Sequence, residues 1–258
     1  MMELQKFSRQ NSFIPDAWES LKAFTNARIA LGRTGVATPL KEVLDFRMCH
    51  AYARDAVYSI LNIDELTESL QQFQIPVILV SSKANDRATY LQRPDLGRRL
   101  NEGSVNNLKN ETSHSVDVAI VIADGLSATA INEHAAHVIK KLIPLLKKSV
   151  LTLAPLVVVE QGRVAIADEI GSILQARVSL ILIGERPGLS SPDSMGAYIT
   201  YQPSPGKTDE SRNCISNIRP EGLGYDLAAE KIAKLIKASL QLKLSGIMLK
   251  DEEQNLLQ

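Results

Sequence analysis

Two acidic residues follow apolar runs of strand length and could contact a bound ligand. Asp124 closes the run that begins at Val116, and Glu185 follows the run 178–183 after one glycine. Uninterrupted apolar runs are typical of strands buried on both faces. Because the carboxyl ends of parallel strands meet at one edge of a sheet, we expect both carboxylates on the rim of a ligand crevice. A turn carboxylate paired with Arg186 or a backbone amide is the alternative for Glu185.

Two histidines, His134 and His137, lie three positions apart in a segment with helical periodicity. This spacing places two imidazoles on one face of a helix, where they could bind a metal ion. No third ligand is defined by the spacing, and such pairs are common on solvated helix faces. We therefore favour an exposed helix face over a metal site.

The two cysteines carry weaker signals. Cys49 and His50 are adjacent, and neighbours on a helix point about 100° apart, so a thiol and imidazole cannot pair there. A packed thiol is the expectation for Cys49. Cys214 opens a short strand-like run after a loop with glycine and proline, and its default role is that of a buried structural cysteine.

Arginines gather in two places. Arg93, Arg98 and Arg99 surround a Pro-Asp turn, and Arg33 lies in the turn 32–35. Planar guanidinium groups suit phosphate, carboxylate or an acidic partner. A solvated network of ion pairs explains the same composition, and by composition alone it is favoured.

Several catalytic motifs are missing. The turn 123–127 has one glycine where a dinucleotide fold requires G-x-G-x-x-G. Gly206-Lys207-Thr208 lacks the upstream glycine of a phosphate-binding loop. The chain also lacks the nucleophile elbow of α/β hydrolases. These absences argue against NAD-binding, NTPase and hydrolase functions.

The elements that position these residues alternate between strands and helices. Apolar runs predict strands, and 3.6-residue periodicity or capping residues predict helices. The expected strands are 77–81, 116–122, 155–159, 163–166 and 178–183, and the expected helices are 39–58, one capped by Ser127, one capped by Asp168, and 226–243 with Gly246 as its stop signal. This order predicts a Rossmann-like α/β fold with an open, mostly parallel sheet. We expect a helical, loop-rich N-terminal lobe over residues 1–105 and a Rossmann-like domain over 106–258, with 101–115 as a linker.

Composition excludes several classes of protein. The 258 residues carry 29 basic and 29 acidic side chains, a net charge of zero, and 5% aromatic residues, so neither nucleic acid nor an anionic membrane surface is an expected partner. The apolar runs are far shorter than the roughly 20 residues of a membrane-spanning helix. Two cysteines are typical of a reducing compartment, which predicts a cytoplasmic protein.

Five blocks taken together closely resemble the small subunit of ethanolamine ammonia-lyase. They are 27–35, 90–100, 123–127, 184–188 and 214–218, in matching order over about residues 25–248. The resemblance implies a hetero-oligomeric, adenosylcobalamin-dependent enzyme that converts ethanolamine to acetaldehyde and ammonia. It implies a large barrel subunit that contacts the substrate and a smaller Rossmann-like subunit, with the corrin between them. This chain is then expected to hold no catalytic residue and to have no activity alone.

The resemblance also assigns cofactor contacts. Carried over by position, the cobalamin-binding residues are Val164, Glu185 and Cys214. Glu185 can accept the N–H groups of the corrin amides, while Val164 and Cys214 offer close backbone or apolar contact. The chain lacks the Asp-x-His-x-x-Gly pattern of cobalt-ligating histidine sites, so no metal-binding residue is expected. The arginines at 33, 93, 98 and 99 face either the cofactor's nucleotide tail or the large subunit.

Two other functions are weighed against this one. The first is a self-sufficient α/β hydrolase that uses Asp124, Glu185 and a nearby histidine, and the second is a scaffold protein whose arginines dock an acidic partner. Family members that enter bacterial microcompartments carry a longer N-terminal extension than the roughly 25 residues that precede the first matching block here. The cytoplasm and a microcompartment therefore both stay open.

Overall fold

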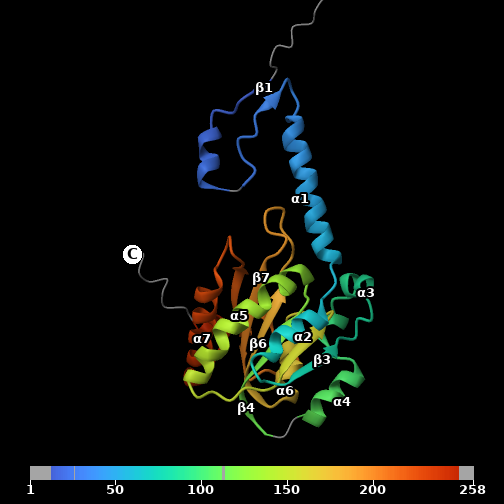
Figure 1. Ribbon diagram of the computed structural model, residues 1–258, viewed down its shortest axis with the longest axis vertical. Coiled ribbons are helices and arrows are strands. Elements are labelled where there is room, and N and C mark those ends of the chain that lie inside the picture. Colours follow the sequence, from blue (N-terminus) through green and yellow to red (C-terminus); the bar gives the residue numbers. More distant parts are fainter. Residues whose placement is uncertain (1–12, 26, 112–113, 250–258) are drawn as a thin grey trace, which may run out of the picture.

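A six-stranded sheet forms the centre of the part of the chain that the structure describes. The computed structural model (Figure 1) describes residues 13–25, 27–111 and 114–249. From one edge to the other the strands are β3 (Val77–Ser81), β5 (Leu156–Glu160), β4 (Val116–Ala123), β6 (Ala176–Gly184), β7 (Met195–Tyr201) and β8 (Arg212–Ile218). The first four are parallel, and β7 and β8 are antiparallel to their neighbours. The predicted mostly parallel α/β fold is confirmed.

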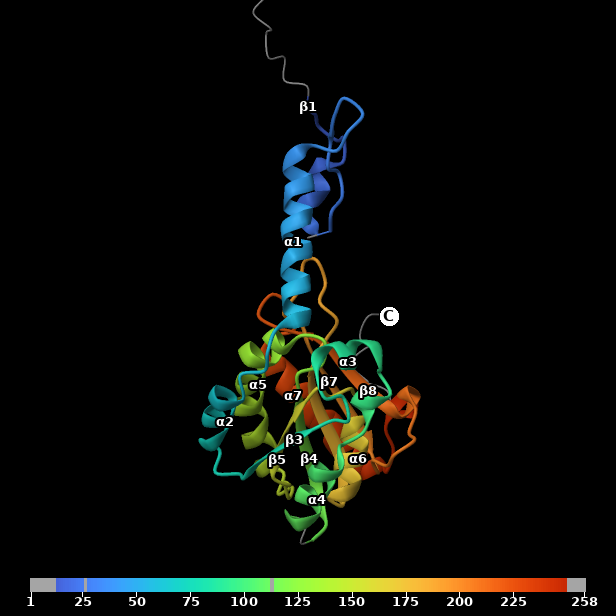
Figure 2. The ribbon, with the colours of Figure 1, turned by 90° about the vertical axis from the view of Figure 1, so that its right-hand side faces the viewer.

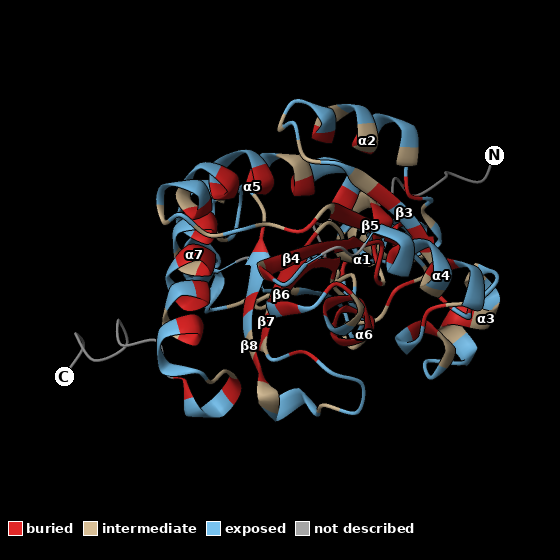
Figure 3. Cartoon of the chain, turned by 90° about the horizontal axis from the view of Figure 1, so that it is seen from below, coloured by how far each residue is buried: buried red, intermediate tan, exposed pale blue. Residues whose placement is uncertain are grey.

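Helices cover both faces of this sheet (Figure 3). The helices are α1 (Leu40–Tyr58), α2 (Ile63–Gln71), α3 (Arg87–Gln92), α4 (Glu102–Glu111), α5 (Ala128–Lys148), α6 (Ile166–Ile173) and α7 (Tyr225–Leu242). Strand β4 shows how the faces are divided. Ile120 and Ile122 pack in the cluster that holds α2, α5 and α7, whereas Val121 and Ala123 pack with α4 and α6. Apolar residues at successive positions follow directly from burial on both faces.

Most predicted elements are confirmed within a few residues. The expected helices 39–58 and 226–243 correspond to α1 and α7, and Ser127 caps α5 by accepting a hydrogen bond from the Ala130 N–H. The residue with left-handed backbone that ends α7 is Lys243, so Gly246 is not its stop signal.

Two local predictions are wrong. The segment 101–115 is not a linker, because residues Glu102–Glu111 form α4 and bury Ser104 and Leu108 against the sheet. The segment is mostly polar because α4 buries only a narrow face, so its sequence shows little apolar periodicity. Residues 163–166 form a turn rather than a strand, and α6 begins at Ile166. Asp168 is therefore not a cap and lies buried in the first turn of α6.

The N-terminal residues form an arm that projects from the sheet domain (Figures 1 and 2). It consists of the strand pair β1 (Phe13–Ile14) and β2 (Arg33–Thr34), a short 3-10 helix (Glu19–Phe24) and α1. We call residues 13–60 the arm and residues 61–249 the body. Strand β3 falls within residues 1–105, which we expected to form a separate N-terminal lobe, but it pairs with β5 of the central sheet. The domain division at residue 105 stays a prediction. Within the described ranges, no helix is long and apolar enough to cross a membrane.

Candidate functional site

A crevice of about 380 Å³ opens at the carboxyl edge of the parallel strands. It lies where the chain order reverses, between the loops that follow β4 and β6, which is where open α/β sheets bind ligands. Its lining residues are Tyr90, Gly125, Leu126, Arg163, Val164, Ile183, Gly184, Glu185, Arg186 and Tyr198. Gly125 has a φ of 59°, and a Cβ there would collide with the Gly184 carbonyl oxygen. The close approach of the two loops therefore requires glycine at this position.

Glu185 presents one free carboxylate oxygen to this crevice. Its Oε2 accepts hydrogen bonds from the Ser194 hydroxyl and, at 3.2 Å, from the Asn217 N–H. Its Oε1 has no hydrogen-bond partner in the described part of the chain. A Cβ at Gly196 would lie 2.9 Å from Oε1, so the glycine keeps space open beside this oxygen. The carboxylate is held in place by one oxygen and can accept N–H groups with the other.

Val164 and Cys214 lie on either side of this carboxylate. Val164 lines the crevice from the loop between β5 and α6. Cys214 is exposed on β8, so the expectation of a buried structural cysteine is wrong. Its register partner on β7 is Tyr198, whose side chain hydrogen-bonds to the Cys214 thiol. Val164 and Glu185 thus line the crevice, and Cys214 lies beside its lining residue Tyr198.

The Cys214 thiol is a neutral contact rather than a thiolate. Partial burial beside the Tyr198 ring raises the pKa of Cys214, the hydrogen bond to Tyr198 opposes this shift, and the Glu185 charge adds to it. Burial likewise raises the pKa of Tyr198. Both groups therefore keep their protons at neutral pH, and Cys214 is not prepared to act as a nucleophile or a metal ligand.

Asp124 lies beneath the crevice and supports it. The prediction that this carboxylate lies on the rim is wrong. It is 3% exposed and accepts the N–H groups of Gly125 and Gly162 at 2.9 and 3.0 Å. Its Oδ2 lies 3.5 Å from the Arg87 guanidinium. Burial raises the pKa of Asp124 to about 6, although Arg87 and the backbone N–H groups oppose that shift. The carboxyl group fixes the two loops and is closed off from a ligand.

Tyr90 joins the crevice to the neighbouring loops. Its ring is fully buried, and the guanidinium groups of Arg87 and Arg163 lie 4.7 and 4.2 Å from its centroid. Its hydroxyl donates to the Gly162 carbonyl at 3.1 Å, and its own carbonyl accepts from Arg163. No motif in the sequence predicted this arrangement, because Arg163 is 73 residues from Tyr90, although Arg87 and Tyr90 both belong to α3.

A second cleft of about 620 Å³ adjoins the crevice, and Arg163 and Val164 line both cavities. Its cationic lining residues are Arg98, Arg99, Arg163, Lys207 and Arg212. The ion pairs expected around the Pro-Asp turn are present: Arg93 pairs with Asp95 at 2.7 Å, both exposed, and Arg99 pairs with Glu169. Arg33 lies away from this cleft, in β2 of the arm.

Arg212 forms a buried ion pair that the sequence did not reveal. Its side chain and that of Asp168 are each 2% exposed, and the two are in direct contact. Arg212 also contacts Asp209 at 2.9 Å and the Lys207 carbonyl at 3.0 Å. Asp168 and Arg212 are 44 residues apart, so no local spacing marks them as partners.

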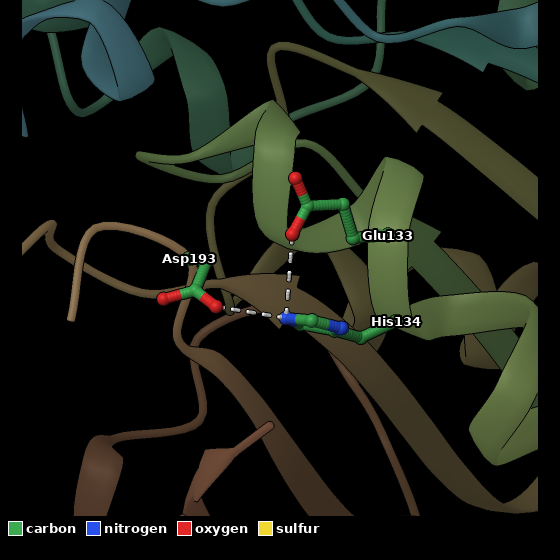
Figure 4. Close-up of side chains that lie close together, drawn as sticks. All are labelled: Glu133, His134 and Asp193. Atoms are coloured by element: carbon green, nitrogen blue, oxygen red, sulfur yellow. Dashed lines mark hydrogen bonds and ion pairs between the residues drawn. The ribbon is translucent and has the colours of Figure 1, made fainter. Parts of the chain in front are cut away.

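The two histidines of α5 have different environments, and Figure 4 shows His134 with Glu133 and Asp193. His134 is 3% exposed, so the prediction of a fully exposed helix face is wrong for this residue. Its Nε2 lies 3.3 Å from Asp193 and 3.9 Å from Glu133, and its Nδ1 lies 3.0 Å from the Tyr225 hydroxyl. His137 is exposed and stacks on Tyr225. His134 therefore holds the loop after β6 against α5, and in the described ranges its partners are these groups rather than Asp124 or Glu185.

The fold and the crevice define an α/β protein with a ligand-sized crevice at the carboxyl edge of a mostly parallel sheet. A model of the family described as ethanolamine ammonia-lyase light chain matches residues 15–250. The chain belongs to this family, which confirms the resemblance seen in the sequence and the predicted role as the small subunit of an ammonia-lyase.

Relatives with this role cover almost the whole chain. The ethanolamine ammonia-lyase small subunit of Xanthomonas campestris pv. campestris is 50% identical over 240 residues, which span 92% of this chain and 88% of the relative. The small subunit from Azotobacter vinelandii is 50% identical over 238 residues, spanning 91% and 88%. That from Pseudomonas paraeruginosa is 49% identical over 247 residues, spanning 93% and 90%. These findings count against the hydrolase and scaffold alternatives.

Proposed function

We propose that this chain clamps adenosylcobalamin against a large barrel subunit, and that the complex converts ethanolamine to acetaldehyde and ammonia. The observation that carries the proposal is the crevice at the carboxyl edge of the sheet. Val164, Glu185 and Tyr198 come from three separate segments and line it, and Cys214 lies beside Tyr198 on the neighbouring strand β8. Family membership supplies the reaction, and the crevice supplies a place for the cofactor.

The residues present fit the chemistry of a corrin edge. A corrin carries neutral amides, whose N–H groups need acceptors, and Glu185 offers one carboxylate oxygen that its own chain leaves free. Hydrogen bonds of this charge-assisted type contribute on the order of 1.5–3 kcal/mol each. Val164 and the neutral Cys214 thiol supply apolar contact. Adenosylcobalamin supplies an organic radical when its cobalt–carbon bond breaks, and this chain positions and shields the cofactor.

The attachment of the arm supports a partner position at the same edge. The Val57 carbonyl at the end of α1 accepts from Arg87 Nε at 2.6 Å, and the Ser59 hydroxyl accepts from the Thr129 N–H at the start of α5. Both attachments lie beside the loop that follows β4, which lines the crevice. In this proposal, a subunit that covers the crevice also lies along the arm. We propose that the large subunit occupies this position in a hetero-oligomer, in the cytoplasm or in a bacterial microcompartment.

Cofactor retention by the assembled complex tests the proposal. Glu185→Ala removes the free acceptor, so we expect cobalamin binding at least about tenfold weaker, while Glu185→Gln, which keeps an amide oxygen, retains part of the affinity. Glu68→Gln on α2, outside the crevice, serves as the matched control. Equal affinity of all four proteins for cobalamin would remove Glu185 from the site.

Activity of the separate chains gives an independent test. We expect acetaldehyde production from ethanolamine only when the small subunit, the large subunit and adenosylcobalamin are combined. Turnover by this chain alone would show that the catalytic residues are its own and would refute the division of roles.

A further inference from the structure

The second cleft begins beside the cofactor crevice and runs past α6 to the loop between β7 and β8, which lies toward the amino ends of the parallel strands. Arg163 and Val164 line both cavities, so a ligand that contacts Val164 from the crevice can extend past it without leaving the surface of this chain. The far side of the cleft is formed by the loop between β7 and β8, which carries Lys207, and the near side by the segment after α3, which carries Arg98.

We propose that this cleft binds the phosphodiester of the cofactor's nucleotide tail, with Arg98 and Lys207 as its principal contacts. The inference rests on the proposed function, because it takes the ligand of the crevice to be a cobalamin. Apart from the cobalt centre, that phosphodiester is the charged group of a cobalamin, whose other side chains are neutral amides. A cationic cleft beside the crevice is the complementary surface for such a charged group.

Only some of the cationic side chains in the cleft form ion pairs with carboxylates of this chain. Arg99 is paired with Glu169, and Arg212 is paired with both Asp168 and Asp209. Arg98 and Lys207 have no ion pair among the residues that the structure describes. Five cationic side chains face three carboxylates in the lining, which leaves a net positive cleft that can take one anionic group.

The walls of the cleft are rigid, which distinguishes it from a patch of surface lysines. Arg212 is 2% exposed in its side chain and is fixed by its two carboxylate partners and by the Lys207 carbonyl. Arg163 is fixed over the Tyr90 ring and donates to the Tyr90 carbonyl at 3.0 Å. Each of the two guanidinium groups keeps a buried Nε–H without a partner in the described structure. The protein therefore holds positive charge in place before any ligand arrives, which lowers the cost of ordering the site.

Two corrinoids that differ only in the phosphate test the inference. We expect the wild-type complex of small and large subunits to bind adenosylcobinamide phosphate more tightly than adenosylcobinamide, as measured by equilibrium dialysis. In Lys207→Met and Arg98→Met complexes this preference should fall by about tenfold or more, while the affinity for adenosylcobinamide stays unchanged. Lys148→Met, at the carboxyl end of α5, removes an equivalent charge outside the cleft and should leave the preference intact.

Each other result overturns the inference in a recognisable way. If both variants keep the wild-type preference for the phosphate, the cleft does not contact it. If they lose affinity equally for both corrinoids, or lose affinity for the large subunit instead, the cleft supports the fold or docks the partner. If the wild-type complex binds neither corrinoid, the proposed function itself fails and the inference falls with it.

Discussion

The arm and the body of this chain differ in how much of their apolar side-chain surface is buried. In the body, α5 has 21 residues and buries ten of them, including Ile131, Val138 and Leu142. In the arm, α1 has 19 residues and buries one, Ala56. Large apolar side chains such as Leu40, Leu44 and Met48 are more than half exposed along α1.

This difference shows where each region obtains its stability. Isolated helices are marginal in water, and most helices in proteins are stabilised by packing an apolar face. The body provides that packing internally through two clusters on the faces of its sheet. The arm leaves its apolar residues uncovered, and exposed apolar patches of this kind mark protein interfaces. The arm therefore depends on a partner for what the body supplies to itself.

Removal of the arm should have the largest effect on assembly and little effect on the body. Deleting residues 1–54 keeps Val57 and its hydrogen bond to Arg87, so the body should retain its melting transition within a few degrees. We expect affinity for the large subunit to fall on the order of a hundredfold or more, measured by co-purification and by titration of the two chains. Undiminished assembly would show that the body carries the interface.

The same substitution in the two regions should differ in its effect on folding. Asp168→Ala leaves the Arg212 guanidinium buried without its main partner, which costs about 3–5 kcal/mol in the free energy of unfolding. Asp45→Ala on α1 should change that free energy by less than about 0.5 kcal/mol. Urea unfolding of the isolated chain measures both, and similar values for the two variants would contradict the contrast between the regions.

The free energy of unfolding should depend on pH through the titration of Asp124. Its pKa is about 6 in the folded chain and about 3.9 when unfolded, so the folded state holds the proton more tightly between these values. The free energy of unfolding of the wild type, relative to Asp124→Asn, should therefore fall as pH rises from 4 to 7, by up to about 3 kcal/mol. Urea titrations of both proteins at each pH test this, and a difference that stays constant or grows with pH would refute it.

The smallest effect is expected at an exposed ion pair in the body. Arg93 and Asp95 are 61% and 58% exposed in their side chains. Asp95→Asn should lower the free energy of unfolding only slightly, because water and salt screen an exposed pair, and added salt should reduce that difference further. A small effect here, beside the large one at Asp168, would show that burial and not position in the body decides the energy. If Asp95→Asn lowered the free energy of unfolding as much as Asp168→Ala does, burial would not explain the difference.

Sequence reasoning found the sheet and the edge where the ligand is expected. The runs that became β3, β4, β5 and β6 are apolar because each strand is buried, and local periodicity reports burial directly. Ser127 and Glu185 were placed correctly because both adjoin such runs. The segment that became α4 was missed because its few buried residues leave little periodic signal.

The side chains around the site were less predictable because their partners are distant in sequence. His134 and Asp193 are 59 residues apart, and Tyr90 and Gly162 are 72 apart. Spacing along the chain cannot report such contacts, and it also placed Asp124 on the rim and Cys214 in the interior. Asp124 is enclosed because the loops of Gly125 and Gly162 and the Arg87 side chain pack around it, whereas Cys214 is exposed because β8 is the edge strand of the sheet.

By itself, the sequence determined the four parallel strands, the long helices α1, α5 and α7, the family and the edge of the sheet at which Glu185 stands. These follow from local apolar patterning and from blocks of residues that keep their order. Only the tertiary structure decided that Asp124 is enclosed, that Arg212 is paired with Asp168, and that a cationic cleft continues the crevice. The reason is physical: hydrophobic periodicity is set within a few residues, whereas charge burial and cavity shape depend on segments that meet only after the chain has folded.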